Sequence, residues 1–207
     1  MDFKAIKILS IVFLTVLLSA CKDKNASAVD LTVPIELLKN GDLAFRCGTS
    51  FESRMVTSMD NKNGPYSHIG IVANIDGEWF VIHAVPGENL PGETDVVKID
   101  SIHEFYGSDR AKLGAIMRVT DDSTKCSNAV NYALWAAKVK KRFDNDFDWN
   151  DTTSLYCTEF VQQAYLHADI DLAQDHRTDV GAILFKGSYV FPLDIAINDS
   201  VRKICDF

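Results

Sequence analysis

A cysteine, Cys157, lies near the predicted start of an amphipathic helix. The apolar residues of segment 153–165 recur with the spacing of one buried helix face: Phe160, Val161, Ala164 and Tyr165. Thr153 or Ser154 is the predicted N-cap, which places Cys157 in the first turn. Unpaired backbone N–H groups and the helix dipole favour negative charge there. Because these conditions lower a thiol pKa, the pattern predicts a thiolate nucleophile.

A histidine, His68, supplies a candidate base, because it enters an apolar strand in segment 66–72. Residues 76–77 (Asp-Gly) form a hairpin signal, and His83 lies on the predicted return strand. The two histidines lie at similar distances from the turn, so pairing of the strands brings them together. Hydrolysis by cysteine and histidine needs a nucleophile, a base and a group that orients the base. Cys157, His68 and His83 fit these three roles.

An acyl-transfer site also needs hydrogen-bond donors for the oxyanion that forms on the substrate. The backbone N–H of Cys157 is the natural donor, since it lies at a helix start. The hydroxyl of Tyr66 or Tyr156 could add a second donor or bind substrate.

Short strands in the middle of the chain and helices on either side of them must position these residues. Apolar patterns and turn residues predict strands at 43–46, 67–75, 78–85, 95–99, 114–119 and 182–185. Helices or helical turns are predicted at 34–39, 51–59, 101–106 and 126–142, besides the helix that carries Cys157. This pattern indicates an α+β fold with helices packed on an antiparallel sheet.

Four segments in this order resemble a known family: residues 41–46, 66–72, 79–84 and 156–161. The chain is similar over residues 38–167 to the circularly permuted NlpC-type, papain-like cysteine hydrolases, the YiiX/YebB-like group. The resemblance implies an antiparallel sheet or small barrel packed against helices. It implies Cys157 as nucleophile and His68 as base, with histidine preceding cysteine. The family commonly has an acidic residue at the position of His83.

The N-terminal segment predicts export and lipid anchoring. Residues 1–20 combine two lysines, a short apolar run and small residues before Cys21, which resembles the signal peptide and lipobox of a bacterial lipoprotein. Residues 21–32 then form a lipidated N-terminus and tether, and residues 33–207 form the hydrolase domain. Lys22 after the cysteine resembles an outer-membrane sorting signal. We therefore expect a lipid-anchored envelope protein that faces the periplasm and contacts the membrane through its lipid.

Composition limits the other roles of the protein. The net charge of −8 argues against nucleic-acid binding. An exported protein can form a disulfide, and the sequence leaves open which pair among Cys47, Cys126 and Cys205 would form it. No zinc-ligand spacing is present, and we expect no metal or cofactor. The acidic aromatic segment 143–151 is a solvated loop, a wall of a substrate cleft or a calcium loop, and it lacks the glycine and terminal glutamate of an EF-hand.

Three functions fit these residues. The leading hypothesis is an exported thiol hydrolase that cleaves an amide bond, in a wall peptide or a small amide or acyl-amide, through an acyl-enzyme on Cys157. The alternatives are a thioesterase or acyltransferase with the same site, and a binding lipoprotein without activity. An apolar cleft beside Cys157 would favour acyl chains, and a polar groove would favour wall peptides. The sequence leaves the substrate and the oligomeric state open.

Overall fold

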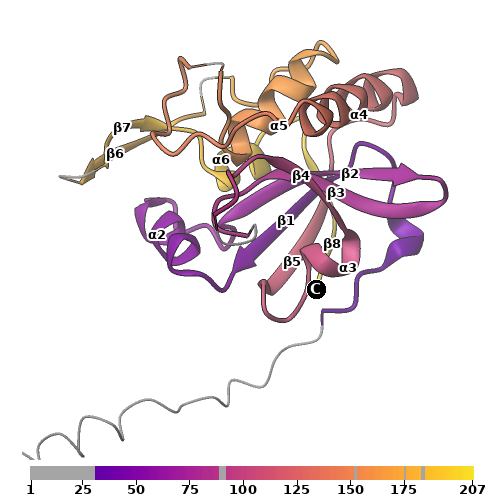
Figure 1. Ribbon diagram of the computed structural model, residues 1–207, viewed down its shortest axis with the longest axis horizontal. Helices are drawn as coiled ribbons and strands as arrows, with labels where there is room; N and C mark the ends of the chain where they lie inside the picture. Colours follow the sequence, from indigo (N-terminus) through magenta and orange to yellow (C-terminus); the bar gives the residue numbers. More distant parts are fainter. Residues whose placement is uncertain (1–30, 89–91, 152, 175, 183–184) are drawn as a thin grey trace, which may run out of the picture.

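The computed structural model describes residues 31–88, 92–151, 153–174, 176–182 and 185–207 (Figure 1). The predicted signal peptide, the lipidation site Cys21 and most of the tether lie outside these residues. Within the described part of the chain, no helix combines the length and apolar composition needed to cross a bilayer.

A six-stranded antiparallel sheet forms the centre of the molecule (Figure 1). Its strands follow the order β4 (Val97–Ser101), β3 (Glu78–Ala84), β2 (His68–Ile75), β1 (Leu43–Gly48), β5 (Ala111–Arg118) and β8 (Arg202–Asp206). A separate hairpin consists of β6 (Thr178–Ala182) and β7 (Phe185–Tyr189). The sheet is open, with β4 and β8 at its edges, so of the two predicted forms the structure has the sheet and not the barrel.

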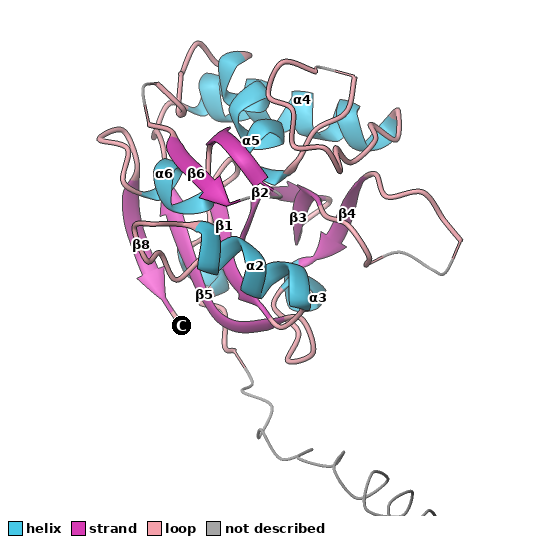
Figure 2. Cartoon of the chain, turned by 90° about the vertical axis from the view of Figure 1, so that its left-hand side faces the viewer, coloured by secondary structure: helices cyan, strands magenta, loops and turns pink. Residues whose placement is uncertain are grey.

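Helices cover both faces of this sheet. On one face lie α4 (Ser123–Lys138) and α5 (Cys157–Leu166), as Figure 1 shows. On the other lies the short α3 (Ile102–Phe105), whose Ser101 and Glu104 form a capping box. Helix α2 (Phe51–Met59) lies beside β1 (Figure 2), α6 (Pro192–Ala196) precedes β8, and a 3-10 turn, η1 (Ile35–Leu37), precedes β1.

Alternation of side chains along the strands produces two apolar layers. Leu43, Phe45, Ile69 and Ile71 face α4 and α5 and form the larger core with Phe160 and its neighbours. Ala44, Val72, Val81 and Ile116 face the other way and pack with Phe105 and Tyr106. Burial of both strand faces explains why β1 and β2 are almost continuously apolar.

Most of the predicted elements are present, and the α+β fold is confirmed. Two expectations are wrong, and one strand was missed. The N-cap of α5 is Tyr156 rather than Thr153 or Ser154, so the helix begins at Cys157 itself. The predicted strand at 182–185 is not one strand, because β6 ends at Ala182 and β7 begins at Phe185, and residues 183 and 184 lie outside the described residues. Strand β8 was not predicted, since its five residues, Arg-Lys-Ile-Cys-Asp, show neither an apolar run nor an alternation of apolar and polar residues.

The four described cysteines are all free, so the structure contains no disulfide among Cys47, Cys126 and Cys205. Cys126 and Cys205 lie on different elements, α4 and β8, and Cys47 lies on β1.

Candidate active site

Cys157 is the first residue of α5 and follows Tyr156, whose side chain makes no capping hydrogen bond. The first N–H groups of a helix lack an acceptor within the helix. The N–H groups of Cys157 and Thr158 point to the cysteine sulfur, and the N–H of Ile69 on β2 does so from the sheet. These three donors can stabilise negative charge on the sulfur or on a substrate oxygen beside it.

The thiol nevertheless has a raised pKa. Burial raises the pKa of Cys157 to about 11, and the three N–H groups and the charge of Arg46 offset only part of this effect. Cys157 is partly exposed, so solvent screens part of this rise in pKa. The expectation that the helix start lowers this pKa is therefore wrong for the resting protein. The thiol is protonated at neutral pH.

His68 and His83 lie side by side in the sheet. The register of β2 and β3 pairs Ile71 with Ile82, and its continuation brings Gly70 beside His83. A Cβ atom at Gly70 would lie 2.9 Å from the Cβ of His83, so only glycine leaves room for the imidazole. The distance from His68 Nε2 to His83 Nδ1 is 2.9 Å. The prediction that the hairpin brings the two histidines together is confirmed.

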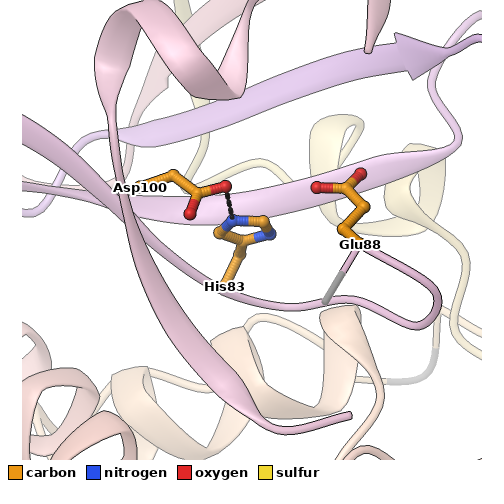
Figure 3. Close-up of side chains that lie close together, drawn as sticks. All are labelled: His83, Glu88 and Asp100. Atoms are coloured by element: carbon orange, nitrogen blue, oxygen red, sulfur yellow. Dashed lines mark hydrogen bonds and ion pairs between the residues drawn. The ribbon is translucent and has the colours of Figure 1, made fainter. Parts of the chain in front are cut away.

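A third residue, Asp100, continues this chain of hydrogen bonds. Its Oδ2 lies 3.1 Å from His83 Nε2 (Figure 3). The register of β3 and β4 pairs His83 with Lys98, so Asp100 lies two residues along on the same face. Sequence analysis missed Asp100. The alternation of Lys98 and Asp100 with apolar Val97 and Ile99 was the signal for a polar strand face.

Both imidazoles are neutral at physiological pH. Burial holds the pKa of His68 well below its usual 6.5, and the charge of Arg46 lowers it further. Burial lowers the pKa of His83 to about 4, although the hydrogen bond to Asp100 opposes this shift. A neutral imidazole can accept a proton, so His68 retains the property that a general base requires.

A second carboxylate, that of Glu88 in the loop after β3, also lies close to the His83 ring (Figure 3). Ligand atoms of His83, Glu88 and Asp100 all lie within 4.8 Å of one another, an arrangement that could hold a metal ion. It is the one group of three or more histidine, cysteine or acidic side chains with this spacing among the described residues.

Three positively charged side chains already neutralise this cluster. Arg46 pairs with Glu88. Lys98 Nζ lies 3.3 Å from Glu88 and 3.0 Å from Asp100. Arg110 Nη1 lies 3.4 Å from Glu88 and 2.7 Å from Asp100. Two carboxylates thus face three cations, which already contact both oxygens of Glu88 and Oδ2 of Asp100.

Cys157 and His68 do not form a direct hydrogen bond in this resting structure, as judged from the contacts of the described residues. The expected contact between sulfur and ring is therefore not made. Ile69, which follows His68 in the chain, instead points its N–H at the sulfur. Catalytic hydrogen bonds are often long or poorly aligned before substrate binds, so the absence of this bond at rest does not exclude His68 as the base.

Cys157 also lines a small apolar pocket with a cavity volume of about 60 Å³. Most of the other lining residues are apolar: Val56 and Met59 of α2, Phe147, and the run Val190, Phe191 and Pro192. The hydroxyl of Thr158 donates to Val190 O at 2.7 Å and fixes this wall to the start of α5. Phe147 belongs to the acidic aromatic segment, so that segment contributes one side chain to the pocket wall.

The two predicted tyrosines occupy different places. Tyr66 donates to Asp206 at 3.3 Å and packs on Phe45, with its pKa raised to about 12, mainly by burial. Tyr156 lines the pocket beside Cys157, and its buried hydroxyl has no hydrogen-bond partner among the described residues. Burial raises the pKa of Tyr156, so the hydroxyl keeps its proton at neutral pH. Tyr156 therefore lies at the site, whereas the hydroxyl of Tyr66 is hydrogen-bonded to Asp206 of β8.

Two acidic residues near the expected motifs have separate roles. Asp42 accepts hydrogen bonds from the guanidinium of Arg118 and from the backbone N–H of Lys39. Glu159, two residues after Cys157, is fully buried with no hydrogen bond to either carboxylate oxygen. Burial raises the pKa of Glu159 to about 8, so this side chain is mainly uncharged at neutral pH.

A cysteine at a helix start, a neighbouring buried pair of histidines and an antiparallel sheet define a papain-like protein in which the histidine strand precedes the cysteine helix. Residues 37–188 match the family described as permuted papain-like amidase enzymes, YaeF/YiiX, C92 family. The chain belongs to this family, and the family is one of hydrolases that cleave amides.

A solved structure supports the same fold. The chain is similar to a protein titled "metalloprotein yiiX from Escherichia coli O157:H7", with a TM-score of 0.66 and 16% identity. The similarity covers 82% of this chain and 97% of that protein. No curated protein matches the sequence.

Proposed function

We propose that this protein is a thiol amidase that acts on substrates with an apolar acyl group, through an acyl-enzyme on Cys157. The observation that carries the proposal is the apolar pocket in whose wall Cys157 lies. In this proposal His68 is the base, and His83 orients the His68 ring. The next residue in the chain, Ile69, points its N–H at the sulfur of Cys157, which places the histidine strand beside the nucleophile. Membership of an amidase family supports the choice of an amide as substrate.

The reaction starts from a neutral thiol and a neutral imidazole. As the sulfur of Cys157 attacks the amide carbonyl, its proton moves to Nδ1 of His68. The N–H groups of Cys157 and Thr158 hold the oxygen that becomes negative. When the C–N bond breaks, His68 returns the proton to the leaving amine and a thioester remains. Water then attacks this thioester, His68 takes its proton, and the free acid leaves as the thiol re-forms.

The lining of the pocket supports one of the two kinds of amide considered above. A wall peptide carries charged and polar groups, whose burial without partners costs free energy. An alkyl or aryl acyl group instead gains about 25 cal/mol for each Å² of apolar surface that it buries. The pocket therefore favours an acyl-amide.

A thioesterase or acyltransferase remains the second candidate, because the same pocket and acyl-enzyme would serve it. Matched substrates separate the two: decanoyl p-nitroanilide as amide, decanoyl-N-acetylcysteamine as thioester, and the acetyl forms of both. We expect the decanoyl amide to be cleaved faster than the acetyl amide in kcat/KM. Cleavage of the thioester alone would favour the second candidate, and equal rates for decanoyl and acetyl amides would contradict the role of the pocket.

Variants of Cys157 test the nucleophile. Cys157→Ala should lose turnover yet keep the fold, as measured by circular dichroism, and Cys157→Ser should lose nearly all turnover because its hydroxyl is a much weaker acid. Mass spectrometry of protein quenched during turnover should show a decanoyl group on Cys157. Full activity in Cys157→Ala would dispose of the thiol mechanism, and absence of turnover in every form would favour a binding protein.

The proposed setting is the bacterial cell envelope, with the protein held at the outer membrane by lipid on Cys21. The support is the sequence of residues 1–22, which resembles a lipoprotein signal. A membrane setting would suit an acyl-amide substrate, since such molecules partition into bilayers.

A metal does not enter this proposal. The similar protein from E. coli is called a metalloprotein, so we tested whether His83, Glu88 and Asp100 fit a cation. They fit poorly, since Lys98 and Arg110 already bind both carboxylates and a divalent ion would add repulsion. No step is assigned to a metal.

A further inference from the structure

We propose that Asp100 is a positioning residue that fixes the tautomers of both His83 and His68, so that the free lone pair of His68 lies on Nδ1. The inference rests on the proposed function, because it states how the base of that reaction is prepared. It assigns a role to a carboxylate that touches neither the cysteine nor the pocket.

The chain of hydrogen bonds permits one order of donors and acceptors when Asp100 is ionised. A carboxylate accepts only, so His83 must carry its proton on Nε2, which lies 3.1 Å from Asp100 Oδ2. In neutral His83 the other nitrogen, Nδ1, then accepts. It receives the Nε2–H of His68 at 2.9 Å. Neutral His68 is left with an unprotonated Nδ1, the form that can take a proton from a thiol.

Asp100 stays ionised because cations surround it. Lys98 and Arg110 both contact the same Oδ2 that faces His83, at 3.0 and 2.7 Å. Burial alone would raise the pKa of Asp100, but the hydrogen bonds from His83 and Lys98 and the charge of Lys98 bring it well below its usual range. The residue is half-buried at the sheet edge, on β4. Glu88 binds the same cations and holds them in the cluster.

The opposite order would disable the site. If His83 carried its proton on Nδ1, that proton would point at His68 Nε2, which would then have to accept it. Neutral His68 would carry its own proton on Nδ1 and could not act as a base there. An orienting residue of a catalytic histidine works by excluding the wrong tautomer. Here the exclusion acts through a second imidazole.

The first test is spectroscopic and needs no substrate. Two-bond ¹H–¹⁵N correlation spectra distinguish protonated from unprotonated ring nitrogens. In the full-length protein near pH 7 we expect the Nε2–H tautomer for both His68 and His83. In Asp100→Asn, whose amide can donate as well as accept, we expect both tautomers of each ring. The matched control is Glu88→Gln, which removes one charge from the same cluster but no bond to His83, and should keep the wild-type tautomers.

The second test uses the decanoyl amide. Loss of a hydrogen bond that involves an ionised group corresponds to roughly 10- to 150-fold. We expect a decrease of that size in kcat for Asp100→Asn with little change in KM, and partial recovery in Asp100→Glu. Addition of Zn²⁺ should leave the His83 resonances in the ¹H–¹⁵N spectrum unchanged, because the cluster is not expected to bind the ion.

The outcomes separate the two proposals. Mixed or reversed tautomers in the wild-type protein, or unchanged tautomers in Asp100→Asn, would overturn the role of Asp100 even in an active enzyme. Shifts of the His83 resonances at stoichiometric Zn²⁺ would overturn it in favour of a metal site. The expected tautomers in a protein without amidase activity would leave the positioning role intact and refute the proposed function.

Discussion

The resting state of Cys157 makes a prediction about its reactivity with pH. Its thiol has a pKa of about 11, so at pH 8 about one molecule in a thousand carries the thiolate. An ordinary thiol with a pKa of about 8.5 is about one quarter ionised there, a difference of roughly 200-fold. The more basic thiolate is intrinsically more nucleophilic, by about tenfold for a Brønsted coefficient of about 0.4–0.5. We therefore expect Cys157 to alkylate roughly 20-fold more slowly than glutathione at pH 8.

The measurement is the rate of iodoacetamide modification of Cys157, read by mass spectrometry of its peptide from pH 5 to 10. Because the thiolate fraction rises tenfold for each pH unit below the pKa, the logarithm of the rate should rise with a slope of about one. Glutathione under the same conditions is the control, and it should level off above its own pKa. A plateau for Cys157 between about pH 5 and 8 would refute the reasoning, since it would mean a thiolate–imidazolium pair at rest.

Three further predictions concern the histidine pair and the anchor. Gly70→Ala should lower stability by about 1–3 kcal/mol in urea unfolding and reduce kcat, because its Cβ would meet Val81 at 2.5 Å and His83 at 2.9 Å; unchanged stability and turnover would contradict this packing. His83→Ala should strongly reduce turnover but still permit alkylation of the cysteine, because His68 Nε2 loses its acceptor; wild-type turnover would leave His83 a structural role. Mass spectrometry of the membrane fraction should find a diacylglyceryl group on Cys21, and a soluble protein with Cys21 unmodified would end that claim.

Local patterns in the sequence were sufficient for the main elements of the site. The helix after Cys157 shows an apolar period of its own, and a two-residue turn fixes which residues of β2 and β3 meet. The separation of His68 and His83 from that turn therefore predicted their contact without any knowledge of the fold. The α+β class followed from the same short-range signals.

Tertiary structure decided which charges surround that pair. Asp100 reaches His83 only because β4 joins β3 in one register, and a shift of one residue would turn its side chain to the other face. Arg46 and Arg110 come from other strands or loops, so no spacing in the sequence connects them with Glu88.

The burial of Cys157 likewise could not be predicted from the sequence. The position of Cys157 at a helix start predicted a lowered pKa, but desolvation by the packed sheet and pocket walls outweighs the helix N–H groups. The apolar pocket arises where α2, Phe147 and residues 190–192 converge on the start of α5. The sequence by itself thus determined the reacting groups, through local periodicity and turns. Their protonation states, the role of Asp100 and the character of the pocket depend on long-range packing, which sets solvent exposure and the distances between charges.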